Sequence, residues 1–210
     1  MAASTAIRAS VDSLPALAAA YAAINAGTPS ATVLEQLAQV TETLLAQVNT
    51  LTEQLNEART CPVTQLPTRA AWNALAAQVC TTGTTAVLLI DLNGFKAVND
   101  THGHAAGDAV LAATGERLKN WAEEFGYAGR LGGDEFAVVM RQENPMDMAL
   151  SIMNLRARLC EPVVHDGVNL SVGAALGAAT VRGRTTEALS EAMGRADRRM
   201  YRDKGRYGRR

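Results

Sequence analysis

The sequence predicts an α+β fold, a central β-sheet combined with helices, preceded by a helical extension. Strand-like and helix-like segments alternate along residues 61–210 around one antiparallel hairpin. That hairpin is the clearest element. Apolar runs at residues 125–131 and 136–140 flank a Gly-Gly-Asp-Glu tetrad, and glycine adopts the positive φ that tight turns need. An apolar fraction of 48% supplies a core, which is mainly aliphatic because aromatic residues make up only 4%.

The extension, residues 1–60, is predicted to be helical. Residues 1–27 form an alanine-rich helix that Pro15 interrupts, and Thr32-Val33-Leu34-Glu35 fits a capping box that begins a second helix. The heptad a and d positions of this second helix are occupied by Leu34, Leu37, Thr41, Leu44, Val48, Leu51, Leu55 and Ala58. This pattern favours a dimerising coiled coil, whereas the off-seam Val40 and Leu45 are equally compatible with a small helical bundle. Both arrangements predict self-association.

The junction with the following domain is predicted at residue 61. Pro62 and Pro67 end the extension, and a helix is expected from about residue 67 to residue 79. The later elements are expected in the order of a buried strand at 84–90, a helix at 104–124, the hairpin, a helix at Met146–Leu159, a strand at Leu170–Val181 and a helix at Thr186–Tyr201.

Composition excludes several classes of protein. The net charge of −1 gives no overall attraction to nucleic acid or to a membrane surface, and no apolar run approaches the length of a membrane span. The three cysteines show no metal-ligand spacing and are odd in number, which favours reduced thiols. The N-terminus makes a poor signal peptide, because Asp12 and Pro15 interrupt it. We therefore expect a cytoplasmic protein.

Two acidic stretches together indicate a metal and phosphate site, although each alone would be read as a solvated turn. Asp91 ends the buried strand before a glycine-containing turn, and Asp134 lies at the hairpin tip on a neighbouring strand. Mg²⁺ takes one or two protein carboxylates and completes its shell with substrate phosphates. The N–H groups after Asp91 and the side chain of Lys96 are candidates for holding phosphate. Because Gly132 and Gly133 have no side chains, a bulky ligand can approach the backbone there.

Residues 61–210 resemble the GGDEF domain, the catalytic domain of diguanylate cyclases. The resemblance is carried by Gly132-Gly133-Asp134-Glu135-Phe136, by Asp91-Leu92-Asn93-Gly94-Phe95-Lys96-Ala97-Val98-Asn99-Asp100, by Gly103-His104 followed by Gly107-Asp108, and by Ala196-Asp197 through Tyr201 to Lys204. It implies a ferredoxin-like βαββαβ nucleotide-cyclase fold. It also implies a homodimer, each domain supplying half of the site, that condenses two GTP molecules into cyclic di-GMP and two pyrophosphates with Mg²⁺ (or Mn²⁺).

The resemblance implies three groups of site residues. The metal ligands and catalytic candidates are Asp91, the carbonyl of Leu92, Asp134 and Glu135, with Asp134 nearest the attacking hydroxyl. The phosphate-binding candidates are Asn93, Gly94, Phe95, Lys96, Gly133 and Lys204, with Arg206 and Arg209 competing for one further position. The guanine-binding candidates are Asn99 and Asp108, since the N1–H and N2–H₂ edge of guanine donates to a carboxylate. On the pattern alone, Asn99 and Asp108 would be ordinary helix-terminal residues.

The chain also departs from the family pattern. Cys61, Gln65 and Thr68 stand where the family has Asp, Gly and Asn, and Asn93 stands where it often has a second Asp. The Arg-x-x-Asp product-inhibition motif is absent from residues 123–126, which predicts no product feedback there. These departures leave open a catalytically silent GTP-binding or scaffolding module that acts through its N-terminal helices. Those helices are also candidates for binding an effector or a protein partner.

Overall fold

The computed structural model describes residue 27 and residues 31–81, 84–141 and 145–207. The chain divides into two compact units, Met1–Glu57 and Ala58–Arg210. Among the described residues, no helix is both long and apolar enough to cross a membrane. The helix predicted at residues 1–27 lies, apart from residue 27, outside the described residues.

The second unit is built on a four-stranded antiparallel sheet. Its order is β2-β3-β1-β6, with β1 at Thr85–Asn93, β2 at Gly126–Gly132, β3 at Glu135–Arg141 and β6 at Gly173–Val181. Strand β1 pairs with both β3 and β6, so that Ile90 lies between Phe136 and Leu176. Every residue of β1 except Asn93 is buried, which explains its continuous apolar run.

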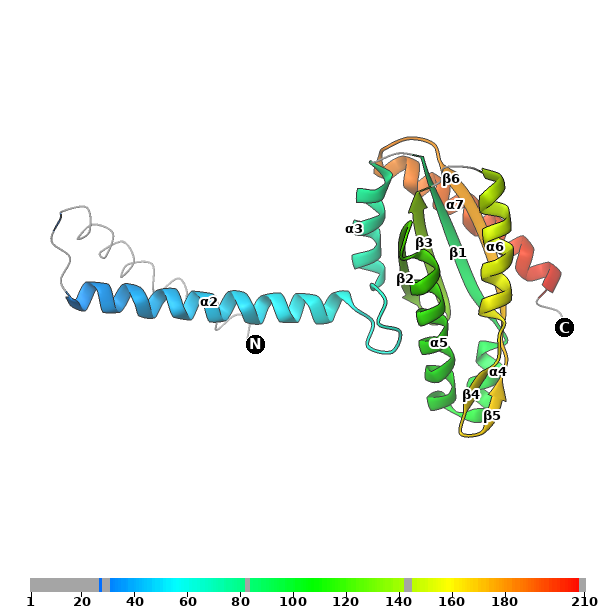
Figure 1. Ribbon diagram of the computed structural model, residues 1–210, viewed down its shortest axis with the longest axis horizontal. Helices are drawn as coiled ribbons and strands as arrows, with labels where there is room; N and C mark the ends of the chain where they lie inside the picture. Colours follow the sequence, from blue (N-terminus) through cyan, green and yellow to red (C-terminus); the bar gives the residue numbers. More distant parts are fainter. Residues whose placement is uncertain (1–26, 28–30, 82–83, 142–144, 208–210) are drawn as a thin grey trace. The chain divides into compact units, whose positions relative to one another are not determined.

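Helices cover both faces of this sheet (Figure 1). Helices α5 (His104–Ala122) and α6 (Pro145–Leu159) lie on one face, and α3 (Arg69–Cys80) and α7 (Thr186–Tyr207) lie on the other. Successive residues of β1 serve the two faces in turn: Leu88 packs into the core with α5 and α6, and Leu89 into the core with α3 and α7. The strand order and the crossover helices are those of the predicted ferredoxin-like βαββαβ fold.

Two glycines let helices approach the sheet closely. A Cβ at Gly177 of β6 would lie 2.0 Å from the carbonyl oxygen of Ala196, so α7 runs directly against the backbone of β6. A Cβ at Gly129 of β2 would lie 2.6 Å from the side chain of Trp72, whose Nε1 donates a hydrogen bond to the carbonyl of Tyr127 at 3.1 Å. Helix α3 therefore packs directly against β2.

Three elements differ from the sequence prediction. Strands β4 (Val163–His165) and β5 (Val168–Leu170) form a hairpin around Asp166-Gly167, whose φ values of 48° and 78° suit a two-residue turn. The strand predicted at Leu170–Val181 is therefore the end of β5 followed by all of β6. Helix α4 (Phe95–His102) was not predicted, and α7 continues to Tyr207 rather than ending at Tyr201.

Helix α2 (Ala31–Arg59) contains the predicted heptad pattern. Thr41, Thr43, Thr50 and Thr52 each donate a hydrogen bond to the carbonyl four residues earlier, at 2.7–3.0 Å, which turns their hydroxyls back onto the helix. The apolar residues at heptad positions are largely accessible: the exposed fraction is 40–61% for Leu34, Leu44, Val48, Leu51 and Leu55.

Candidate active site

The end of β1 meets the tip of the β2–β3 hairpin. In the sheet register Asp91 lies opposite Glu135 of β3, and the N–H of Leu92 donates a hydrogen bond to the carbonyl oxygen of Asp134 at 3.3 Å. Asp91 is 8% exposed, so its carboxylate requires a compensating partner. The structure thus brings together the four residues that the sequence predicted as metal ligands and catalytic candidates.

Lys204 supplies the compensating charge. Its Nζ lies 2.7 Å from Oδ1 of Asp91 and 2.8 Å from Oδ2, and the Asp91 side chain is only 11% exposed. The contact forms because α7 continues beyond Tyr201 and carries Lys204 to the end of β1. The sequence predicted Lys204 as a phosphate ligand, whereas in this structure its ammonium group binds a predicted metal ligand.

Arg130 holds the glycine turn of the hairpin. Its Nε and Nη2 donate to the carbonyl oxygen of Gly133 at 3.0 and 2.7 Å, and Gly133 has a φ of 46°. Its Nη1 lies 3.2 Å from Sγ of Cys61, in the segment that precedes α3. Burial tends to raise the pKa of the Cys61 thiol, but hydrogen bonds with Thr64, Arg130 and the backbone of Val63 lower that pKa to about 7. The turn is thereby tied to a thiol that titrates near neutral pH.

Arg69 ties the other side of the hairpin to α3. Its Nε donates to the carbonyl oxygen of Leu131 at 2.8 Å, and its Nη2 lies 3.4 Å from Oε2 of Glu135. Both side chains of the ion pair are about half exposed, with fractions of 55% and 49%, so the pair adds little stability. Its effect is to orient Glu135, and sequence reasoning missed Arg69 because the two residues lie 66 positions apart.

A cleft of about 480 Å³ opens beside Asp134 and Lys204. It is lined by Leu92, Asn93, Gly94, Phe95, Lys96, Asp134, Tyr201, Lys204 and Gly205. Its volume falls within the range of small-molecule sites. Most of the predicted phosphate-binding residues therefore share one cavity. Tyr201 and Gly205 also line the cleft, although neither was predicted to bind a ligand; Gly205 reaches the cleft because α7 extends to Tyr207.

The groups at this cleft fit a hard divalent cation. The carboxylates of Asp91 and Asp134 and the carbonyl of Leu92 offer oxygen ligands. Oδ1 of Asn93 is buried with no hydrogen-bond partner among the described residues. Within those residues no three or more His, Cys, Asp or Glu side chains cluster as a metal cage. A site with few protein ligands, completed by substrate phosphates, is the arrangement that Mg²⁺ favours.

The predicted guanine ligands lie beside each other at the contact between α4 and α5. A Cβ on Gly107 would lie 1.9 Å from Oδ1 of Asn99, so the Asn99 amide rests directly on the glycine that precedes Asp108. Asn99 is half-buried and Asp108 is exposed. Neither residue lines the cleft beside Lys204. Arg209 lies outside the described residues, and so does the side chain of Arg206.

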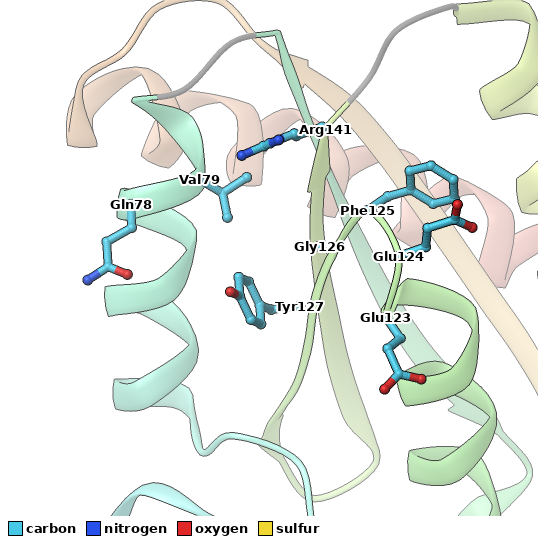
Figure 2. Close-up of a pocket in the computed structure, with 8 residues that line it drawn as sticks. All are labelled: Gln78, Val79, Glu123, Glu124, Phe125, Gly126, Tyr127 and Arg141. Carbon is cyan, nitrogen blue, oxygen red and sulfur yellow. The ribbon is translucent and has the colours of Figure 1, made fainter.

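A second cleft, of about 350 Å³, is lined in part by residues 123–126, the stretch that lacks the Arg-x-x-Asp motif (Figure 2). Its lining combines two acids, a base and two aromatic rings, in the set Gln78, Val79, Glu123, Glu124, Phe125, Gly126, Tyr127 and Arg141. Figure 2 shows Tyr127 and Arg141 pointing toward α3, with Glu123 near the end of α5. The absence of product feedback at residues 123–126 stays a prediction.

Comparisons with known proteins identify the second unit. Residues 58–210 match the family model described as "Diguanylate cyclase, GGDEF domain". The chain is 45% identical over 157 residues to an uncharacterised 19.3 kDa protein of Streptomyces ambofaciens, covering 74% of this chain and 84% of that one. It is 41% identical over 123 residues to the diguanylate cyclase DgcP of Escherichia coli, covering 56% of this chain and 35% of DgcP.

The solved structures agree. A sensory box/GGDEF family protein from Caulobacter crescentus superposes with a TM-score of 0.62 at 38% identity, over 70% of this chain and 98% of that one. The chain spans well under half the length of several curated relatives that it matches. With the family model covering residues 58–210, the chain belongs to the GGDEF diguanylate cyclase family.

Proposed function

We propose that the protein condenses two GTP molecules into cyclic di-GMP and two pyrophosphates. The observation that carries this proposal is that Asp134 and Lys204 line one cleft of nucleotide size, where Lys204 also contacts the buried carboxylate of Asp91. Phosphoryl transfer depends mostly on positioning and on charge neutralisation, and these side chains supply both. A divalent cation, Mg²⁺ or Mn²⁺, would activate the 3′-hydroxyl and neutralise charge on the leaving group when bound.

The proposed roles rest on the resemblance to GGDEF domains and are supported by the contacts of Asp91, Asp134, Glu135 and Lys204 described above. Asp91, Asp134 and the carbonyl of Leu92 hold the cation, and Asp134 at the hairpin tip lies nearest the attacking hydroxyl. Glu135 is a further ligand that Arg69 orients. Phosphates would bind along the N-terminus of α4 and to Lys204, and the carboxylate of Asp91 would then be available to a cation. Lys96, Arg206 and Arg209 are additional phosphate ligands, and Asn99 and Asp108 bind guanine.

A homodimer is proposed because cyclic di-GMP is symmetric. Each hydroxyl attacks the α-phosphate of the other nucleotide, so two clefts of the kind beside Lys204 must face each other. The exposed leucines of α2 give the chain a surface for pairing two copies. Residues 1–60 are therefore proposed to dimerise and to receive an effector or protein partner. The reaction is proposed to take place in the cytoplasm, where Cys61, Cys80 and Cys160 stay reduced.

The test is incubation of the purified full-length protein with GTP and Mg²⁺, with products separated by chromatography. We expect cyclic di-GMP from the wild type and from Glu116→Ala, which removes an exposed carboxylate of α5 outside both clefts. Asp134→Ala should abolish product formation. GTP binding without product in the wild type would instead support the silent module, and attention would move to the partners of residues 1–60.

Feedback by the product is tested separately by calorimetry. We expect no tight binding of cyclic di-GMP at the second cleft, because Glu123 and Glu124 repel its phosphates. Tight binding that is lost when residues 123–126 are replaced would contradict this proposal.

A further inference from the structure

Side chains of α7 form hydrogen bonds with backbone groups along the outer edge of β6 at regular intervals. Strand β6 ends the sheet, so one row of its backbone groups has no neighbouring strand. Arg195 Nη2 donates to the carbonyl oxygen of Thr180 at 2.8 Å, and Arg199 Nη1 donates to the carbonyl oxygen of Ala178. Asp203 Oδ2 accepts from the N–H of Leu176 at 2.9 Å. We call this set of contacts the edge ladder.

The spacing of the edge ladder follows from helix and strand geometry. Its rungs use every fourth residue of α7 and every second residue of β6, running in opposite directions. Four helical residues advance about 6 Å, and two strand residues advance about 6.7 Å. The spacing of the side chains along α7 therefore nearly matches the spacing of the backbone groups along β6 over the three rungs. The long arginine side chains can span the remaining difference in length.

The charges of the rungs match the strand groups they meet. The first two rungs face carbonyl oxygens and are arginines, which only donate. The third faces an N–H and is an aspartate, which only accepts when ionised. The three rungs together hold α7 against the edge of β6.

Arg156 of α6 strengthens the last rung. Its Nη2 lies 2.7 Å from Oδ2 of Asp203, and its Nη1 donates to the carbonyl oxygen of Ala174 at 3.1 Å. The side chains of Arg156 and Asp203 are 30% and 16% exposed, so the pair is better shielded from solvent than the Arg69–Glu135 pair. Charge-assisted hydrogen bonds in such a setting are the strong ones.

The last rung lies next to the proposed active site. Lys204 follows Asp203 directly in the chain. Arg156 and Asp203 bind the backbone of Ala174 and Leu176, and Ala175, the residue between these two, lies opposite Asp91 in the sheet register. We infer that Asp203, held by Arg156, is a positioning residue. It fixes the end of α7 on β6 and so places Nζ of Lys204 at Asp91. The catalytic consequence rests on the function proposed above, whereas the placement of Lys204 does not.

The test compares the two ends of the ladder in the full-length protein. Asp203→Ala removes the rung beside Lys204, and Arg195→Ala removes the rung farthest from it. We expect Asp203→Ala to raise the KM for GTP roughly tenfold, the effect of losing one charge-assisted hydrogen bond. Arg195→Ala should change KM by less than about twofold, because later rungs still hold the helix end. Asp203→Asn should recover part of the loss, since its amide oxygen still accepts from Leu176.

Crystal structures of the two alanine variants give a readout that does not depend on activity. In Asp203→Ala, Nζ of Lys204 should lie beyond the 2.7 Å contact with Asp91, and in Arg195→Ala the contact should remain. If the wild type makes no cyclic di-GMP, the proposed function fails and these structures alone decide the inference. Lys204 still bound to Asp91 in Asp203→Ala, or equal KM effects from the two alanine variants, would overturn it.

Discussion

The thiol of Cys61 should make the stability of the second unit depend on pH, and Cys61→Ser should remove that dependence. Cys61 is 8% exposed, so burial favours the neutral thiol. Hydrogen bonds with Thr64 and Arg130 outweigh this effect and lower the pKa from 9.0 to about 7. The folded state therefore favours the thiolate more than the unfolded state does.

The direction and size of the effect follow from this pKa. A group with a lowered pKa in the folded state stabilises that state above its unfolded pKa and loses the contribution as pH falls through its folded pKa. For Cys61 the contribution is absent below about pH 7, grows through the interval and is complete above about pH 9. The upper bound is about 2.7 kcal/mol, at about 1.36 kcal/mol per pH unit. Arg130 is only half-buried, so we expect about 1–2 kcal/mol.

Urea unfolding of the full-length protein at about pH 6, 7.5 and 9 measures this difference. Both tryptophans, Trp72 and Trp121, lie in the second unit and report on its unfolding. The free energy of unfolding of the wild type should rise with pH relative to Cys61→Ser. The control is Cys160→Ser, which replaces an exposed thiol and should keep the wild-type profile. Parallel profiles for the wild type and Cys61→Ser would refute the reasoning.

Two further predictions concern packing and assembly. Gly177→Ala should lower the free energy of unfolding by about 3 kcal/mol or more, because its Cβ would lie 2.0 Å from a backbone oxygen of α7. Gly194→Ala, on α7, is the control: its Cβ would lie 3.7 Å from the nearest atom, and alanine in a helix should raise the free energy of unfolding by about 0.5–1 kcal/mol. Equal urea midpoints for the two variants would contradict this account. Replacing Leu51 and Leu55 by Glu should give a monomer in light scattering, while Leu150→Glu, equally exposed on α6, should not.

The fold was predictable where local residue types determine local structure. The two glycines of the β2–β3 turn adopt φ values of 150° and 46°, which explains why the Gly-Gly-Asp-Glu tetrad marked the hairpin correctly. The apolar run ending at Asp91 is buried on both faces, as the absence of polar alternation indicated. Both features need no knowledge of distant residues.

The missed elements have different causes. The turn at Asp166-Gly167 carries the Asp-Gly signal of a two-residue hairpin, but its strands have only three residues each and too little periodicity to detect. Helix α4 has eight residues and a single buried one, Val98, so it shows no apolar stripe. The end of α7 was placed too early because residues 202–207 are mostly polar or charged. There, tertiary contacts of Asp203 and Lys204 support the helix.

The contact between Lys204 and Asp91 shows why site residues were easier to predict than their partners. The motifs identified both residues, which lie 113 positions apart, but assigned the ammonium group to phosphate and the carboxylate to a cation. An ionised carboxylate that is only 11% exposed is costly to leave unpaired, and here the ammonium group of Lys204 pairs with it. The residue types show which charges the site contains. Which of these charges pair with each other depends on the other ions and ligands that are bound there. In this structure the two side chains neutralise each other, and under the function proposed above Asp91 would instead neutralise a cation and Lys204 a phosphate, so that in both states each charge has a partner.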